Sequence, residues 1–285
     1  MGAYKKAILS LDTLRKLASN FLQAFGLLAM LLGVAAAFWP TEVGRFGGNG
    51  FCLMIIVSVA YALFASWPRF SHSRTFKVPD MKVSVKIGDL LKEHGNVVIG
   101  MNDVFDTEIG RGIIARSSLQ GQFLERIYQN DRGKLDSDLQ LSLSSQPLAT
   151  TKDAAKTVGK DERFPLGTVA VLDHEGSKYF CVAYSNMGTN LMATSDIGTI
   201  WSSLEKLWQA IRSHGEQARV VMPVIGADLS RVVGVSHDML IELIISSFVI
   251  NSRIQPITKE FTLVIHPSNL SKINFAEIRK FVDGL

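Results

Sequence analysis

Two strand-to-loop junctions carry the polar residues that could bind a ligand. The first spans Val97 to Thr107, where an apolar strand pattern leads directly into Asn102, Asp103 and Asp106. The second spans Val220 to Arg231, where another apolar run opens into a loop of small residues. In open parallel sheets, ligands bind outside the carboxyl ends of the strands. The pattern therefore predicts one shared ligand site, although polar turns punctuated by glycine would have the same composition.

The second junction favours an anionic ligand, because small residues let backbone N–H groups approach a phosphate closely. The Arg231 guanidinium would add a charge-assisted contact. The sequence contains none of the motifs typical of other chemistries: it has no GxxxxGK[ST] loop, GxGxxG after a strand, GxSxG elbow, HExxH or CxxC. The six histidines are scattered, with no pair at metal-ligand spacing. We therefore expect no catalytic residue, no metal site and no resident cofactor.

The charge and cysteine content restrict the partners and the compartment. The net charge is only +4, and much of the positive charge flanks two apolar segments, so we expect no nucleic-acid partner. Cys52 and Cys181 are not expected to form a disulfide, which fits a reducing compartment.

The elements that must position these junctions alternate along the chain. Strand patterns cover 83–87, 96–101, 167–172, 178–184, 219–224 and 261–265, and helical patterns cover 117–129, 197–214, 236–250 and 269–281. Such alternation predicts an α/β domain of three layers with a mixed, mainly parallel sheet. The segment 131–165 is polar and has no readable period.

Two apolar segments precede this domain. Phe21–Trp39 and Phe51–Trp67 contain no charged residue, and as helices they would be about 28 and 25 Å long, close to a hydrocarbon core of about 30 Å. We therefore predict two transmembrane α-helices. Basic residues flank the pair, whereas the connection Pro40–Gly50 carries only Glu42 and Arg45. The positive-inside rule then predicts a multi-pass protein of the inner membrane with both termini in the cytoplasm.

Four parts follow along the chain: an amphipathic segment at 1–20, a transmembrane hairpin at 21–67, a linker at 68–80 and the ligand-binding domain at 81–285. Small residues recur every fourth position in the hairpin, at Ala29, Gly33 and Ala37 and at Ser58, Ala62 and Ser66. This spacing lets helices approach closely. Packing between the two helices of one chain and self-association of several chains are both consistent with it.

The order of these motifs resembles that of the macro domain, a module that binds ADP-ribose. Val85–Leu90 is similar to the opening strand and Gly-Asp-Ile turn of that family, whose Asp, here Asp89, accepts a hydrogen bond from the adenine amino group. Ser117–Gly121 lies where the family has a glycine-rich phosphate loop, and Pro223–Arg231 resembles its second phosphate loop. The closing strand and helix of the family also have counterparts near the C-terminus.

Two departures from the family bear on catalysis. The Asn-Ala-Ala-Asn strand end is Gly-Met-Asn-Asp in this chain, and the run of glycines is reduced to Gly121, with Gly110 and Gly112 nearby. Hydrolytic macro domains use these features to place the distal ribose and a water. Their loss implies ligand binding without ADP-ribosyl hydrolysis.

The whole arrangement resembles the transmembrane-macro effectors of bacterial Thoeris antiphage defence. In that family a TIR enzyme makes an ADP-ribose-containing signal from NAD, histidine-ADP-ribose in the described branch, and the effector binds it and acts on the membrane. The resemblance implies an effector with the lipid bilayer and this nucleotide signal as partners. We expect a homo-oligomer that disrupts the membrane and causes cell death or growth arrest.

The resemblance and the junctions together give one set of ligand-binding residues: Asp89, Asn102, Asp103, Asp106, Ser118, Gln120, Gly121, Gly226, Ala227, Asp228, Leu229, Ser230 and Arg231. Two alternatives stay open at this point. One is a membrane-tethered ADP-ribosyl hydrolase in which Asp103 or Asp106 is the general base. The other is a membrane scaffold whose macro domain binds only proteins.

Overall fold

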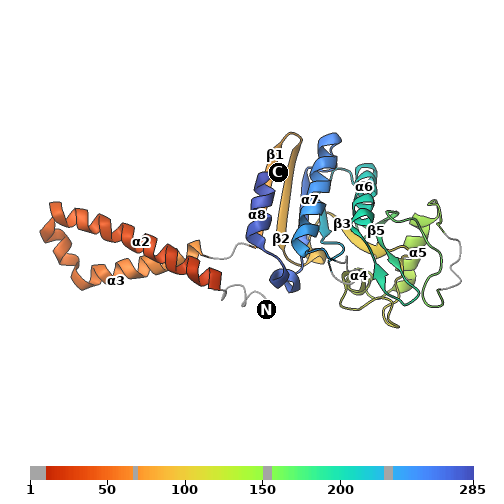
Figure 1. Cartoon of the computed structure of the whole chain (residues 1–285), viewed down its shortest axis with the longest axis horizontal. Coiled ribbons are helices and arrows are strands. Elements are labelled where there is room, and N and C mark those ends of the chain that lie inside the picture. The colour runs from red at the N-terminus through yellow and green to blue at the C-terminus, as the bar shows by residue number, and fades with distance from the viewer. Residues whose placement is uncertain (1–10, 67–69, 150–155, 228–233) are drawn as a thin grey trace. The chain divides into compact units, whose positions relative to one another are not determined.

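A computed structural model describes residues 11–66, 70–149, 156–227 and 234–285 of this chain. The chain divides into two compact units, 1–69 and 70–285, and each is described by itself (Figure 1).

The N-terminal unit is a hairpin of two helices, α2 (Leu11–Phe38) and α3 (Pro40–Ala65). Only Trp39 separates them. Pro40 has no N–H to continue the α2 ladder, and its fixed φ suits the first position of a new helix. Both helices contain stretches long and apolar enough to cross a membrane, 14–38 and 47–65.

One expectation in this unit is wrong. The connection Pro40–Gly50, expected to be a loop, is the first part of α3, with a kink at Gly47 where φ is +40°. The part of the expected amphipathic segment that the structure describes, 11–20, is already the beginning of α2.

The two stripes of small residues have different environments. Ser58, Ala62 and Ser66 are buried in the hairpin, and the Ser66 hydroxyl accepts a hydrogen bond from Asn20 Nδ2 at 3.0 Å. Packing between the two helices therefore explains this stripe. The stripe on α2, Ala29–Gly33–Ala37, is exposed, and a Cβ added at Gly33 would meet nothing within 4 Å.

The C-terminal unit is built on a mixed sheet in the order β1-β2-β8-β7-β3-β5-β4, with β6 pairing to β5. Strands β2, β8, β7, β3 and β5 are parallel, and β1 and β4 are antiparallel to their neighbours. The strand bounds are β1 Ser71–Lys77, β2 Asp80–Ile87, β3 Asn96–Asn102, β4 Val169–His174, β5 Ser177–Met187, β6 Ala193–Thr194, β7 Val220–Pro223 and β8 Glu260–Ile265.

Helices cover both faces of this sheet (Figure 1). They are α4 Leu119–Arg126, α5 Arg132–Leu143, α6 Ile197–His214, α7 His237–Ile254 and α8 Phe275–Gly284, with short 3-10 helices η1 Leu90–Lys92 and η2 Pro267–Lys272. On one face, Ile99 of β3 packs in a cluster with Phe123 of α4 and Leu139 of α5. On the other, Trp208 of α6 packs edge-on against Phe261 of β8. The prediction of a three-layer domain with a mainly parallel sheet is confirmed.

The predicted linker at 68–80 is wrong, because most of it is strand β1. Phe76 is buried and pairs with Met81 across a tight turn, so the domain begins at Phe70. The strand is SHSRTFK, which lacks an apolar alternation, as is common for a strand at the edge of a sheet. Within 131–165, the Asp131 side chain caps the start of helix α5 by accepting from Lys134 N at 2.9 Å.

Candidate functional site

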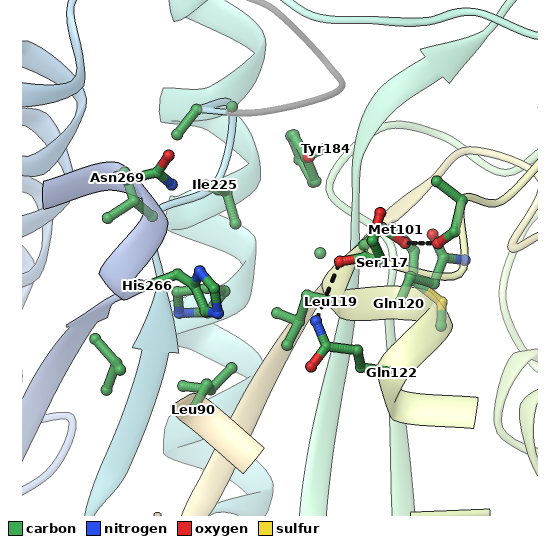
Figure 2. A pocket seen from close by; sticks show the side chains of 18 of the residues that line it. Leu90, Met101, Ser117, Leu119, Gln120, Gln122, Tyr184, Ile225, His266 and Asn269 are labelled. Carbon is green, nitrogen blue, oxygen red and sulfur yellow. Dashed lines mark hydrogen bonds between the residues drawn. The ribbon is translucent and has the colours of Figure 1, made fainter. Parts of the chain in front are cut away.

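A cleft of about 530 Å³ lies at the carboxyl ends of the five parallel strands. Its floor is formed where these strands end, at Gly88 after β2, Asn102 of β3, Ser185 of β5, Pro223 of β7 and His266 after β8. Figure 2 shows side chains from these elements and from α4 pointing toward one another. The rule that ligands bind at this edge of a parallel sheet predicted its location.

Asp89 lies at one end of the cleft and caps η1. Its carboxylate accepts from Leu91 N at 3.2 Å and pairs with Arg126 at 3.0 Å. Burial raises the pKa of Asp89, but the hydrogen bond and charge of Arg126 outweigh it, so the pKa lies below its usual value. Asp89 is therefore ionised at neutral pH and can only accept hydrogen bonds from a ligand.

The first turn of α4 forms one wall. Ser118 is the N-cap: its hydroxyl accepts from Gly121 N at 3.1 Å and donates to Ala115 O at 2.6 Å. Ser118 and Gln120 line the cleft. A helix N-terminus offers backbone N–H groups and a positive dipole end, which suits a phosphate.

Gly121 has a structural role rather than a place in the lining. A Cβ there would lie 2.5 Å from Ala115 O and 2.7 Å from Arg116 O. Only glycine lets α4 approach the preceding loop this closely. Gly121 therefore fixes the position of the Ser118 turn without contacting the cleft.

Asn102 lies in the lining, but its amide is already engaged within its own loop. Its Oδ1 accepts from Val104 N at 3.3 Å and Asp106 N at 3.1 Å, and its Nδ2 donates to Asp106 Oδ2 at 3.4 Å. Every residue from Met101 to Thr107 is buried. Asn102 thus holds a buried loop in shape at the floor of the cleft.

Asp103 and Asp106, predicted to lie beside the ligand, are outside the lining of the cleft. Asp103 Oδ2 lies 2.5 Å from Arg163 Nη1, and its Oδ1 accepts from Met187 N at 2.8 Å. Asp106 forms a buried ion pair with Lys156, at 3.1 Å between Oδ2 and Nζ. Buried carboxylates need such partners because an unpaired charge is costly in a dry interior.

A strap formed by residues 156–164 supplies these cations. Asp106 Oδ1 also accepts from Lys160 N at 2.8 Å, and Phe164 N donates to Asp103 O at 2.8 Å. The Phe164 ring packs edge-on against Phe105 at 5.5 Å between centroids. The strap therefore locks the loop that carries both carboxylates.

The second predicted loop is described only in part. Gly226 and Ala227 line the cleft, and Gly226 has φ +80°, a conformation that other residues rarely adopt. Asp228, Leu229, Ser230 and Arg231 lie outside the described residues.

Several lining residues carried no sequence signal. Tyr184 lies over Gly100, where a Cβ would approach the ring to 2.5 Å. His266 projects into the cleft, with Nδ1 2.7 Å from Ser268 Oγ. Ile113 and Ile114 belong to a small apolar cluster with Met187. Each could have been found only by knowing which segments meet at this edge.

The lining is almost free of charge. Within the described parts of the chain, Asp89 is its only Asp, Glu, Lys or Arg residue. No group of His, Cys, Asp and Glu suited to a metal ion occurs among the described residues. The described lining thus offers a ligand one fixed carboxylate and the N-terminus of α4.

Helices on both faces of a mixed sheet and a cleft at the ends of its parallel strands are the architecture of a macro domain. A family model described as "Thoeris protein ThsA, Macro domain" matches residues 83–266, and the chain belongs to this family. A Thoeris protein ThsA from Bacillus amyloliquefaciens (strain Y2) is 24% identical over 221 residues, which cover 74% of this chain and 71% of that protein.

Two solved structures were also found to be similar to this chain. A point mutant of the Oceanobacillus iheyensis macrodomain has a TM-score of 0.49 and 11% identity, covering 75% of this chain and 96% of its own. The same macrodomain with ADP has a TM-score of 0.43 and 11% identity, covering 76% and 99%.

Proposed function

We propose that this chain is a membrane-anchored Thoeris effector whose macro domain binds an ADP-ribose-derived signal and does not turn it over. The observation that carries the binding proposal is the cleft of about 530 Å³ at the strand ends. Its size falls within the range of about 300–1,000 Å³ typical of small-ligand sites. The α4 N-terminus would hold the diphosphate, and Asp89 would accept from the adenine amino group.

The ion pairs of Asp103 and Asp106 support binding without hydrolysis. A general base must reach the proton it removes, directly or through one water. Both carboxylates face protein donors and lie outside the lining of the cleft. Freeing either one would require breaking an ion pair with Arg163 or Lys156.

The apolar hairpin supports a membrane role for the effector. Its two helices would anchor the chain in the inner membrane, with both termini in the cytoplasm. The signal, such as histidine-ADP-ribose, would come from a TIR-domain enzyme. Binding would change the packing of a homo-oligomer and compromise the membrane, with cell death or growth arrest as the result. The exposed Ala29–Gly33–Ala37 face of α2 supports helix association of this kind.

Calorimetric titration of the full chain in detergent micelles with ADP-ribose and histidine-ADP-ribose tests the binding proposal. Gly226→Val places a branched side chain at φ +80° in the lining and should abolish binding. Gly176→Val is the matched control, because Gly176 has φ +76° in the β4–β5 turn, away from the cleft. Equal affinities of the two variants would show that the ligand binds elsewhere.

Chromatography of the ligand after incubation tests the absence of turnover. We expect histidine-ADP-ribose and ADP-ribosylated peptides to be recovered intact. Release of free ADP-ribose by the parent, but not by Asp106→Asn, would establish the hydrolase alternative instead.

A further inference from the structure

Asp89 reaches the cleft with most of its hydrogen-bonding capacity already used. Its Oδ1 accepts from Leu91 N at 3.2 Å and from Arg126 Nη1 at 3.1 Å, and its Oδ2 lies 3.0 Å from Arg126 Nη2. A carboxylate has about four acceptor sites, so about one remains for a ligand. The two-pronged contact with the guanidinium also fixes the plane of the carboxylate. Asp89 therefore offers the cleft about one acceptor in a set direction.

Arg126 connects this acceptor to the other end of the α4 wall. Arg126 Nη1 donates to Gln122 Oε1 at 3.3 Å, and Gln122 Nε2 donates to Ser117 O at 3.1 Å, a bond drawn in Figure 2. Asp89, Gln122 and Ser117 line the cleft, whereas Arg126 does not. One hydrogen-bonded chain thus runs along the wall, with Arg126 at its centre and outside the lining.

We infer that Arg126 is a positioning residue that makes the cleft selective for a base with an amino group at position 6. This inference rests on the proposed binding of an ADP-ribose derivative. Adenine donates from that amino group to the acceptor that Arg126 holds in place. Hypoxanthine has a carbonyl there. Two acceptors would then face each other, and no hydrogen bond could form between the base and Asp89. A carboxylate free to turn away would lose its hydrogen bond to adenine and avoid the repulsion by the hypoxanthine carbonyl, so selectivity depends on the fork of Arg126.

The affinities of the full chain in detergent micelles for ADP-ribose and for inosine diphosphate ribose test this inference. We expect the parent to prefer ADP-ribose by about tenfold or more, the scale of one hydrogen bond to a charged group. Arg126→Gln should reduce the ratio to about threefold or less, because one amide cannot hold both carboxylate oxygens. Arg126→Lys keeps the charge without the fork and should give an intermediate ratio. Lys280→Gln, which removes a surface pair with Glu277 on α8, is the control and should keep the parent ratio.

A double-mutant cycle separates positioning from mere packing. If Arg126 acts through Asp89, then Arg126→Gln should leave the ratio unchanged in an Asp89→Asn background. A structural role alone would weaken both ligands equally and leave the ratio intact in either background. If Arg126→Gln shows no thermal unfolding transition, it is not folded. The ratio of the two affinities measured for Arg126→Lys then tests the inference.

The outcomes distinguish this inference from the proposed function. A parent that binds neither nucleotide overturns both. A parent that prefers ADP-ribose, with the same preference in Arg126→Gln and Arg126→Lys, overturns the role of Arg126 and leaves the proposed function standing.

Discussion

Replacing Lys156 with methionine should strongly destabilise the macro domain. Lys156 and Asp106 have side-chain exposures of 0% and 1%, with Nζ 3.1 Å from Oδ2. Removing one partner of a buried ion pair leaves the other charge unpaired and costs about 3–5 kcal/mol. Asp106 would keep its contacts with Asn102 and Lys160 N, but these are hydrogen bonds and supply no counter-charge.

The buried thiol of Cys181 provides the assay. Burial raises the pKa of this thiol, so it stays unreactive until the domain unfolds. In a Cys52→Ser background, thiol labelling over a urea series reports unfolding of the macro domain alone. Lys160→Met is the matched control, because its side chain is 30% exposed and pairs with Asp136 at 2.6 Å. Such an exposed pair is worth about 0–1 kcal/mol.

Labelling of Lys156→Met and Lys160→Met at the same urea concentration would show that the ion pair does not hold the strap. The strap would then be held by packing, such as the Phe105–Phe164 contact, and not by the ion pair. A second variant sharpens the test. Lys156→Met with Asp106→Leu removes the unpaired charge and should recover part of the lost stability.

Four further predictions concern the site, the pH response and the membrane. Asp89→Ala should weaken ADP-ribose binding by about 1–3 kcal/mol in calorimetry, since a hydrogen bond to a charged group is lost. Burial raises the pKa of Glu93, but Lys86 and Arg219 outweigh it and hold the pKa below its usual value. Its ion pairs therefore stabilise the fold fully above the ordinary pKa of 4.5 and lose their effect as the pH falls through the folded pKa. The free energy of unfolding of Glu93→Gln should therefore equal that of the parent only in acid. A cysteine at Gly48, in a chain lacking Cys52, should react with an impermeant reagent from outside the cell, and labelling from the cytoplasm alone would reverse the predicted topology. Gly33→Leu should abolish growth arrest while nucleotide affinity stays unchanged, whereas toxicity that survives deletion of residues 1–68 would exclude a membrane mechanism.

The order of elements and the location of the cleft could be predicted because both follow from local patterns. Apolar runs of strand length give the parallel core, and parallel strands bring their carboxyl ends to one edge. Asp89, Asn102, Ser118, Gln120, Gly226 and Ala227 line the cleft for this reason. Whether they bind the ligand stays a prediction.

The environment of Asp103 and Asp106 could not be predicted, because their partners are distant in the sequence. Lys156 and Arg163 lie 50 and 60 residues further along the chain, in a polar segment without a period. Sequence patterns report which face of an element is buried, and give no signal for a strap that crosses a loop. Strand β1 was missed for a related reason, since a charged edge strand does not alternate.

The contact between Gly100 and Tyr184 has a consequence for how this cleft can evolve. The ring occupies the space that any side chain at Gly100 would need, 2.5 Å from the position of its Cβ. Even an alanine at Gly100 requires the ring to move first, so Gly100 cannot change while Tyr184 keeps its ring in place. We expect related chains to carry a larger residue at the first position only where the second has become small. Aligned sequences should then show these two sites changing together, which would mark the floor of the cleft without any structure.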